Sequence, residues 1–219
     1  MSAWFDCADT AQRTEGLAAA VTAVLAGELV VLPTDTVYGV GADAFSPAAV
    51  NRLLTAKGRG RNMPPPVLVG TVRAAEALVE DLGPDGRQLI DEFWPGGLTI
   101  VCRAARTLSW DLGDTKGTVA IRMPDQPIAL DLLRETGPMA VSSANATGSA
   151  AATTAAEARD QLGESVAIYL DGGPCESAVA STIVDLTGPQ AQLLRRGAIS
   201  VGRLREVAAV LARADAEPA

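Results

Sequence analysis

The order of short apolar segments and helical segments constrains the fold of this chain more than any other feature of its sequence. Apolar runs typical of strands cover residues 29–33, 67–69, 98–102, 118–121, 139–142, 167–170, 181–186 and 191–194. Helical patterns occupy residues 14–26, 47–57, 72–82, 85–93, 126–135, 155–162 and 200–213. Such alternation predicts an α/β fold, and the pairs of strands late in the chain favour a mixed, twisted sheet flanked by helices.

The length and composition suit one domain with an aliphatic core. The chain has 219 residues, of which 48% are hydrophobic, and neither a Gly/Ser-rich linker nor a repeat divides it. We expect an N-terminal extension over 1–13, the main domain over 14–205, and the end of the C-terminal helix with an acidic tail over 206–219. The N-terminus has no basic region before an apolar run, and no apolar run approaches the ~20 residues that span a bilayer. We therefore expect a cytoplasmic protein without a membrane partner.

Several kinds of chemistry are excluded by what the chain lacks. It contains no histidine, so Ser-His-Asp and Cys-His nucleophilic schemes and histidine metal ligands are impossible. Its three cysteines are far apart in sequence, with no spacing that suits zinc, and their odd number argues against a disulfide framework. No GxxxxGK[ST] phosphate-binding loop occurs. Any reaction must use lysine, arginine, carboxylates, hydroxyls and the backbone.

Positive charge is concentrated in one part of an acidic protein. The formal net charge is −8, yet residues 44–75 contain no acidic side chain and include Lys57 and Arg59 at the end of a predicted helix. Charges at a helix end are often only solvated, because cations there interact favourably with the helix dipole. A local cationic site on an acidic chain instead favours a small anionic ligand, since binding of a bulk polyanion would more often come with a basic domain.

Other polar segments also follow or precede predicted strands, although each alone could be an ordinary turn. They contain Thr34 and Tyr38 in one segment, Arg122 in a second, Ser143 and Asn145 in a third, Ser181 before a late strand, and Arg195 and Arg196 after another. The ends of sheet strands are where open α/β folds bind ligands. These segments therefore predict one shared cavity.

A dinucleotide-binding motif is a weaker alternative. Residues 39–44 read Gly-Val-Gly-Ala-Asp-Ala, which matches GxGxxA. In dinucleotide-binding folds the helix begins within this motif, whereas here the capping signal is the later Ser46-Pro47. The ribose-binding acid expected about 20 residues further on is also missing, although an arginine-rich segment could accept a 2′-phosphate.

Several motifs together resemble those of a known family. They are Pro33-Thr-Asp-Thr-Val-Tyr-Gly-Val-Gly41, Lys57-x-Arg59, Pro95-Gly-Gly-x-Thr99, Arg122-x-Pro124, Ser143-Ala-Asn-x-x-Gly148 and Ser181-Thr-Ile-Val-Asp185. In this order they resemble the YrdC-like family over roughly residues 27–197. The resemblance implies a twisted α/β sheet around a concave, positively charged cavity.

The resemblance also implies a nucleotidyltransferase activity. The family reaction combines L-threonine, bicarbonate and ATP into threonylcarbamoyl-adenylate and pyrophosphate, which supplies the modification of an adenosine beside the tRNA anticodon. Mg²⁺ would accompany ATP, with no dedicated protein cage visible and Asp35 the only nearby carboxylate. Implied partners are the three substrates and, transiently, a threonylcarbamoyl transferase complex or tRNA.

The resemblance assigns roles to individual residues. Lys57 and Arg59 would be catalytic and face the phosphates and the carbamate. The implied ATP-binding residues are Arg59, Thr118, Ser143, Asn145 and Arg196. The implied threonine-binding residues are Thr34, Tyr38, Arg122 and Ser181, with Arg122 binding the carboxylate.

The sequence departs from the family pattern in places and leaves two rival functions open. Gln126 stands where a histidine often follows Arg-x-Pro, and the chain ends without the extra C-terminal domain of longer members. One rival is an RNA-binding or ribosome-maturation module of the same fold, against which a pI near 4.6 argues. The other is a carbamoyl-transfer paralogue that acts on another substrate.

Overall fold

The computed structural model describes residues 2–175 and 178–207. The predicted final helix begins near the expected residue, as α7 (Val201–Val207). Its expected continuation to residue 213 and the acidic tail lie outside the described residues.

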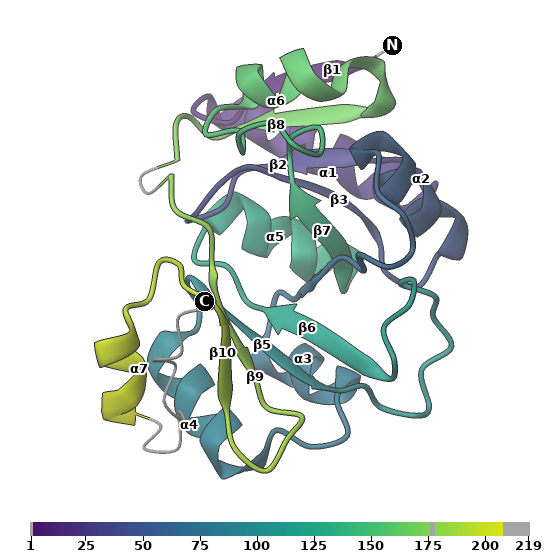
Figure 1. Cartoon of the computed structure of the whole chain (residues 1–219). Coiled ribbons are helices and arrows are strands. Elements are labelled where there is room, and N and C mark those ends of the chain that lie inside the picture. The colour runs from purple at the N-terminus through teal and green to yellow at the C-terminus, as the bar shows by residue number, and fades with distance from the viewer. Residues whose placement is uncertain (1, 176–177, 208–219) are drawn as a thin grey trace.

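A mixed sheet forms the centre of the molecule (Figure 1). Its strands are β1 (Ala3–Asp6), β2 (Val30–Leu32), β3 (Gly39–Asp43), β4 (Val67–Leu68), β5 (Leu98–Arg103), β6 (Thr118–Arg122), β7 (Met139–Ser143), β8 (Ile168–Asp171), β9 (Thr182–Asp185) and β10 (Gln192–Arg195). Their order in space is β1-β8-β2-β3-β7-β4-β6-β5-β9-β10. Strands β1, β2, β4 and β5 have parallel partners, whereas β3 and β7 pair only antiparallel. The predicted α/β fold with a mixed sheet is therefore confirmed.

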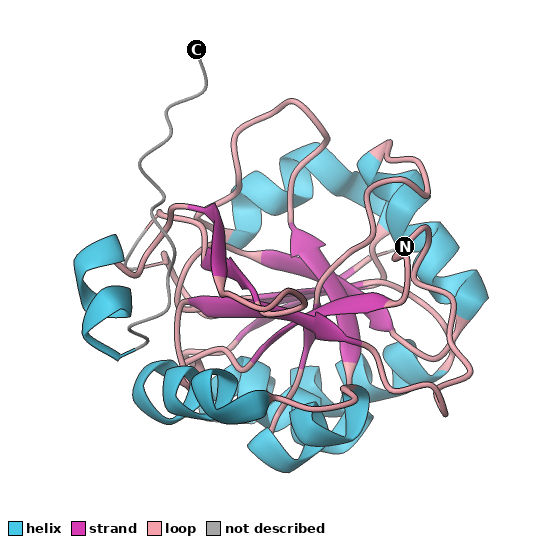
Figure 2. Cartoon of the chain, turned by 60° about the horizontal axis from the view of Figure 1, so that its bottom comes forward, coloured by secondary structure: helices cyan, strands magenta, loops and turns pink. Residues whose placement is uncertain are grey.

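Helices cover the sheet on both sides (Figure 2). They are α1 (Thr10–Leu25), α2 (Pro47–Lys57), α3 (Val72–Leu78), α4 (Gly83–Phe93), α5 (Pro127–Thr136), α6 (Ala155–Leu162), the 3₁₀ turn η1 (Gly163–Ser165) and α7. Buried residues of α1 and α5 form one apolar cluster with β2, β7 and β8. Those of α2, α3, α4 and α6 form the second cluster, on the other side. Each helix thus buries its apolar face against the sheet, which is the main source of its stability.

One part of the sheet keeps an open face. In β5 and β6 the residues Ile100, Cys102, Val119 and Ile121 are buried, and α3 and α4 contact these strands. Successive side chains of a strand point to opposite faces, so the residues between them face the other way. On that other face lie half-buried residues, among them Val101 of β5 and its register partner Ala120 of β6. Thr118 of β6 and Ile183 of β9 are also half-buried. The face that α3 and α4 do not cover is therefore accessible beside the ends of β6 and β9.

Two strands were not predicted from the sequence. β1 is a four-residue edge strand that pairs only with β8, and its sequence has too short an apolar pattern to be recognised as a strand. β3 lies where a polar turn over 34–44 was expected, and that expectation was wrong for its second half. Its glycines have low strand propensity, but pairing with β2 and β7 on either side overrides that preference.

The glycines of β3 have a packing role. A Cβ atom on Gly39 would lie 2.7 Å from Val141 Cγ1, and one on Gly41 would lie 2.8 Å from Met139 Cε. Both residues are therefore required to be small by the side chains of β7. The GxGxxA motif lies inside a strand rather than at a strand-to-helix turn, so it cannot act as a dinucleotide-binding turn.

No described helix combines the length and the apolar character that crossing a bilayer requires.

Candidate active site

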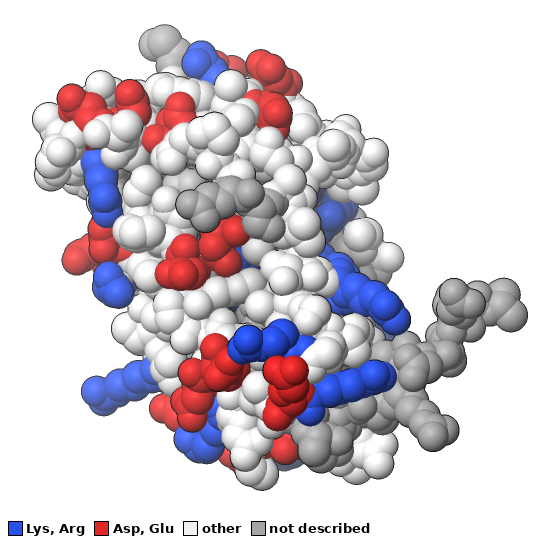
Figure 3. Space-filling view, turned by 90° about the vertical axis from the view of Figure 1, so that its left-hand side faces the viewer, with Lys and Arg blue, Asp and Glu red and all other residues white. Residues whose placement is uncertain are grey.

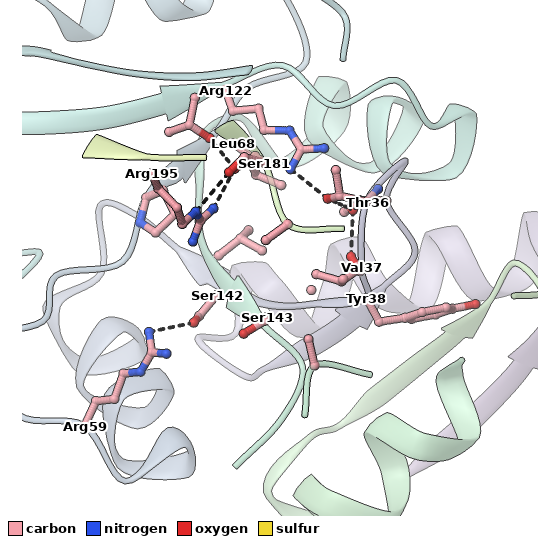
Figure 4. A pocket seen from close by; sticks show the side chains of 17 residues that line it. Thr36, Val37, Tyr38, Arg59, Leu68, Arg122, Ser142, Ser143, Ser181 and Arg195 are labelled. Carbon is pink, nitrogen blue, oxygen red and sulfur yellow. Dashed lines mark hydrogen bonds between the residues drawn. The ribbon is translucent and has the colours of Figure 1, made fainter. Parts of the chain in front are cut away.

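A cavity of about 190 Å³ opens where the ends of several strands meet (Figure 4). It is lined by Thr34, Thr36, Val37, Tyr38, Gly39, Arg59, Pro66, Leu68, Thr99, Arg122, Val141, Ser142, Ser143, Ala151, Ala180, Ser181 and Arg195. These residues come from most of the polar segments that the sequence placed at strand ends. The cavity is smaller than the ~300 Å³ typical of sites for drug-sized ligands, so it suits a ligand about the size of an amino acid.

The charges at this cavity are of one sign. Arg59, Arg122 and Arg195 line it, and none of the lining residues is acidic. Within the described part of the chain neither Arg59 nor Arg195 has a carboxylate partner, whereas Arg122 is paired with Asp35. Arginine side chains present several N–H donors in a fixed plane, which matches carboxylate and phosphate groups. The wall therefore offers donors and positive charge to an anionic ligand.

Arg122, the last residue of β6, is held on three sides. Its Nε donates to the Gly96 carbonyl at 2.9 Å, Nη1 to Thr36 Oγ1 at 2.9 Å, and Nη2 to Asp35 Oδ1 at 2.5 Å. Burial lowers the pKa of this guanidinium, and the charge of Asp35 opposes that effect. Because a guanidinium has five N–H groups, one on each terminal nitrogen remains available for a ligand.

Arg195 faces Arg122 from the end of β10. Its Nε and Nη2 donate to the carbonyl and Oγ of Ser181, both at 2.9 Å, and Ser181 Oγ lies 2.8 Å from Thr99 Oγ1. The pKa of Arg195 is lowered by burial and, to a lesser degree, by the charge of Arg122. Two cations that repel each other across a cavity are stabilised when an anion binds between them.

The resemblance named Arg196, as an ATP-binding residue, and not Arg195. Both side chains are exposed, but only Arg195 is among the lining residues. The two adjacent arginines cannot be told apart by composition. β10 has a register irregularity next to Arg195 that alters the simple alternation of side chains, and no sequence signal marks it.

Arg59 approaches the cavity from the end of α2. Gly58 ends this helix with φ of 64°, a left-handed conformation that glycine adopts readily, and this reverses the chain so that Arg59 leaves in a new direction. Arg59 Nη1 then donates to Ser142 Oγ at 3.1 Å, and its Nε donates to Thr147 Oγ1 at 3.3 Å. Lys57-Gly58-Arg59 therefore places two cations on different sides of one turn.

Lys57 lies behind the cavity wall, not on it. The residue is 1% exposed and does not line the cavity. Its Nζ donates to the Ser143 carbonyl at 2.5 Å, to Asn145 Oδ1 at 3.0 Å, and to the Asn145 carbonyl. Burial, with a smaller contribution from Arg59, lowers its pKa from 10.5 to about 8. All three ammonium protons therefore have acceptors at the end of β7 and in the segment that follows it.

Asn145 belongs to the same buried arrangement. Its Nδ2 donates to the carbonyls of Ala146 and Ser149 at 2.9 and 2.8 Å, while its Oδ1 accepts from Lys57. Asn145 therefore shapes its own loop. Its neighbour Ser143 lines the cavity, as expected for a ligand-contacting residue.

The predicted threonine-binding hydroxyls of Thr34 and Tyr38 are engaged within the chain. Tyr38 lines the cavity, but its hydroxyl points away, donates to the Gly173 carbonyl at 2.6 Å and accepts from Gly172 N at 3.0 Å (Figure 4). Burial raises the pKa of this phenol. Thr34 Oγ1 donates to the Val37 carbonyl at 2.6 Å and accepts from Thr36 N at 3.2 Å. These residues shape the wall from β2 to β3.

Thr118 lies outside the enclosed cavity, at the other end of β6 from Arg122. The two are four positions apart in β6, so their side chains share one face of the sheet at about 13 Å along the strand. The Thr118 hydroxyl donates to the Thr115 carbonyl at 2.8 Å. Thr118 therefore lies at the far end of the open sheet face.

Many cations elsewhere on the surface have carboxylate partners. Pairs include Arg13–Asp131, Arg52–Glu28, Arg61–Asp111, Arg87–Glu76, Arg106–Glu80 and Arg203–Glu92. On the face shown in Figure 3, the described acidic and basic side chains are interspersed and form no broad basic area. What distinguishes Arg59 and Arg195 is that they lie together on the wall of one cavity without an acidic lining residue.

No group of three or more acidic, cysteine or histidine side chains in the described residues is arranged to hold a metal ion. Asp35, the nearest carboxylate, accepts from Arg122 and, at 3.0 Å, from Asp125 N through the same oxygen. Its position is explained by Arg122, so a divalent cation at this site would need other ligands, such as phosphate oxygens and water.

Comparisons with known proteins agree with this arrangement. The family model Sua5/YciO/YrdC, described as "Telomere recombination", matches residues 22–197. A protein of Mycobacterium tuberculosis, provisionally named threonylcarbamoyl-AMP synthase, is 55% identical over 210 residues, which are 96% of this chain and 97% of that protein. The threonylcarbamoyl-AMP synthase of Bacillus subtilis is 36% identical over 209 residues, or 93% of this chain and 60% of that protein.

Solved structures extend the comparison to the fold. Pyrococcus abyssi Sua5 complexed with L-threonine has a TM-score of 0.88 at 31% identity, over 96% of this chain and 62% of that one. Escherichia coli YciO has a TM-score of 0.79 at 24% identity, over 92% of this chain and 98% of that one, which supports the fold alone. The family match over most of the chain and the relatives above 30% identity leave one assignment: the chain belongs to the Sua5/YciO/YrdC family.

Proposed function

We propose that the protein is an L-threonylcarbamoyladenylate synthase, which forms threonylcarbamoyl-AMP and pyrophosphate from L-threonine, bicarbonate and ATP. The observation that carries the proposal is the cavity with Arg59, Arg122 and Arg195 on its wall and no carboxylate among its lining residues. Relatives named threonylcarbamoyl-AMP synthase and the threonine complex of Sua5 support this substrate set.

The enclosed part of the cavity is the proposed threonine site. Arg122 and Arg195 lie on either side of Ser181, and both have N–H groups left for a carboxylate. The apolar side chains of Leu68 and Val141 line the same space and would contact the aliphatic part of the amino acid. With no acidic group on the wall, nothing there pairs with an ammonium group, so the neutral amine that must react is favoured over its protonated form.

ATP would extend from the cavity over the open sheet face. Arg59 lies at the edge of the cavity, where it could bind phosphate, with Ser142 and Ser143 beside it. From there the half-buried Val101 and Ala120 form a flat apolar area, and Thr118 lies at its end. Such a surface suits a nucleoside. Mg²⁺ would enter with ATP as part of the substrate, bound by phosphate oxygens and water.

The proposed reaction needs no covalent enzyme intermediate. The threonine amine attacks the carbon of bicarbonate, water leaves, and an N-carboxylate forms. An oxygen of that carboxylate attacks the α-phosphorus of ATP, and pyrophosphate departs with the electron pair of the broken P–O bond. The arginines position both anions and stabilise the charge that develops on the phosphate oxygens, a role that suits a chain without histidine.

The proposed product is a mixed anhydride that a later enzyme must consume. We propose that it is passed to a threonylcarbamoyl transferase acting on adenosine in tRNA, within the cytoplasm where ATP and tRNA are present.

Pyrophosphate release tests the proposal. The protein is mixed with MgATP, bicarbonate and each amino acid in turn, and pyrophosphate is measured. We expect release only when threonine and bicarbonate are both present. Equal release with serine or without an amino acid would contradict the substrate assignment, and release of inorganic phosphate alone would contradict adenylate formation.

A further inference from the structure

Two buried threonines, Thr34 and Thr36, lie next to Arg122, and no role in the reaction has been assigned to Thr36. Thr34 and Thr36 are 6% and 1% exposed, and both lie in the segment between β2 and β3. Their hydroxyl oxygens are 3.0 Å apart, and Thr36 Oγ1 also lies 2.9 Å from Arg122 Nη1. Figure 4 shows Thr36 next to Arg122, on the side where the chain turns towards Tyr38.

The directions of these hydrogen bonds follow from counting protons. A threonine hydroxyl has one proton to donate. Thr34 gives its proton to the Val37 carbonyl at 2.6 Å, because a carbonyl can only accept. The bond between the two hydroxyls must then be donated by Thr36. Since Arg122 Nη1 can only donate, Thr36 Oγ1 accepts from it. The result is a one-way chain from Arg122 through Thr36 and Thr34 to the backbone.

This chain leaves neither threonine with a proton for a ligand. Thr34 also accepts from Thr36 N at 3.2 Å, so its donor and both acceptor positions are occupied. Thr36 donates to Thr34 and accepts from Arg122. What the pair provides is a fixed acceptor for one terminal nitrogen of the guanidinium. Asp35 holds the other terminal nitrogen, and the Gly96 carbonyl holds Nε.

We propose that Thr36 is a positioning residue for Arg122, and that its hydroxyl fixes the plane in which the guanidinium presents its remaining N–H groups to the amino-acid carboxylate. That the ligand is the threonine carboxylate rests on the proposed function, whereas the contact between Thr36 and Arg122 is seen in the structure. The Gly96 carbonyl and Asp35 hold Nε and Nη2, and Thr36 supplies the third contact, at Nη1. Thr36 contacts the guanidinium from another side, at Nη1, and Thr36 is too buried to move when a ligand binds.

The test compares two substitutions at Thr36. Thr36→Val keeps the shape and removes the hydroxyl, whereas Thr36→Ser keeps the hydroxyl. Thr136→Val is the matched control, because it removes a half-buried hydroxyl that bonds only to the Leu132 and Gly137 carbonyls at the end of α5. Pyrophosphate release gives KM for threonine and KM for ATP. A second readout is the ¹⁵N resonance and hydrogen-exchange rate of the Arg122 side chain, assigned with Arg122→Lys, in protein without substrates.

We expect Thr36→Val to raise KM for threonine on the order of tenfold, the effect of weakening one charged hydrogen bond, and to change KM for ATP less than about twofold. The Arg122 side-chain resonance should shift and exchange faster. Thr36→Ser and Thr136→Val should resemble the wild type in both readouts. If Thr36→Val does not fold, Thr36→Cys takes its place, since a thiol is only a weak acceptor.

Two results would overturn the proposal. An unchanged Arg122 resonance in folded Thr36→Val would show that the hydroxyl does not hold the guanidinium. Equal losses with Thr36→Ser, which keeps the hydroxyl, and Thr36→Val, which removes it, would assign the effect to packing at this position rather than to the hydroxyl. Failure of the wild type to release pyrophosphate with threonine would instead contradict the proposed function, and the resonance readout would still decide the role of Thr36.

Discussion

Replacing Lys57 by methionine should destabilise the fold, although its motif resembles a ligand-binding one. The ammonium gives hydrogen bonds to the Ser143 carbonyl and to both oxygens of Asn145, and hydrogen bonds to charged groups are worth ~1.5–3 kcal/mol each. Against them stands the cost of burying the charge: lowering the pKa from 10.5 to about 8 corresponds to about 3 kcal/mol. We expect the free energy of unfolding of Lys57→Met to fall by about 2–5 kcal/mol at pH 7.

Denaturant unfolding measures this loss, and Arg59→Met provides the matched control two residues away. Arg59 is only half-buried and bonds to two side-chain hydroxyls, so its loss should change stability by less than about 1 kcal/mol. It should still reduce turnover by about 10²-fold or more, the effect of losing a charge-stabilising donor. A Lys57→Met protein as stable as the wild type would refute the view that Lys57 holds the segment after β7.

Three further predictions concern Lys57, Arg122 and Gly39. The free energy of unfolding of the wild type should exceed that of Lys57→Met by a difference that is constant below about pH 7. Between pH 8 and 10.5 this difference should rise by up to about 3 kcal/mol, because there the unfolded wild type keeps a proton on Lys57 that the folded wild type has released. A difference that falls with pH in urea titrations would contradict this. Arg122→Lys should raise KM for threonine by about 10–100-fold with little change in KM for ATP, since one ammonium group cannot replace a planar guanidinium held by three contacts. A loss of affinity confined to ATP in calorimetry would assign Arg122 to the phosphates. Gly39→Ala should lower stability by about 1–3 kcal/mol, because its Cβ would lie 2.7 Å from Val141 Cγ1, and an unchanged melting temperature would show that β7 can move aside.

The sequence predicted the elements whose signals are local. α2 begins with Ser46 as its N-cap and Pro47 as its first residue and ends at Lys57, as expected, because capping is decided by neighbouring residues. The segments at strand ends were also predicted to meet, and Arg59, Arg122, Ser143 and Ser181 do line one cavity. Arg122 and Ser143 end apolar strands, Ser181 precedes one and Arg59 follows a capped helix, and each of these elements is recognisable without knowledge of its partners.

What the sequence could not predict depends on contacts between distant residues. Lys57 and Arg59 look equivalent in sequence, yet one is buried behind the wall, since only the fold brings the carbonyls after β7 to the end of α2. The Tyr38 hydroxyl was expected at the ligand, but its partners come from residues after β8. Thr36 was overlooked because its role lies in the direction of a hydrogen bond to Arg122, which no motif encodes.

The most direct test of the proposed function follows one carbon atom. The protein is incubated with MgATP, L-threonine and ¹³C-bicarbonate, and the nucleotide products are examined by mass spectrometry. The account predicts threonylcarbamoyl-AMP carrying a single ¹³C in the carbamoyl group, formed in equal amount with pyrophosphate, and its loss in Arg59→Met. Formation of ADP and phosphate, or of an unlabelled threonyl adenylate, would contradict it.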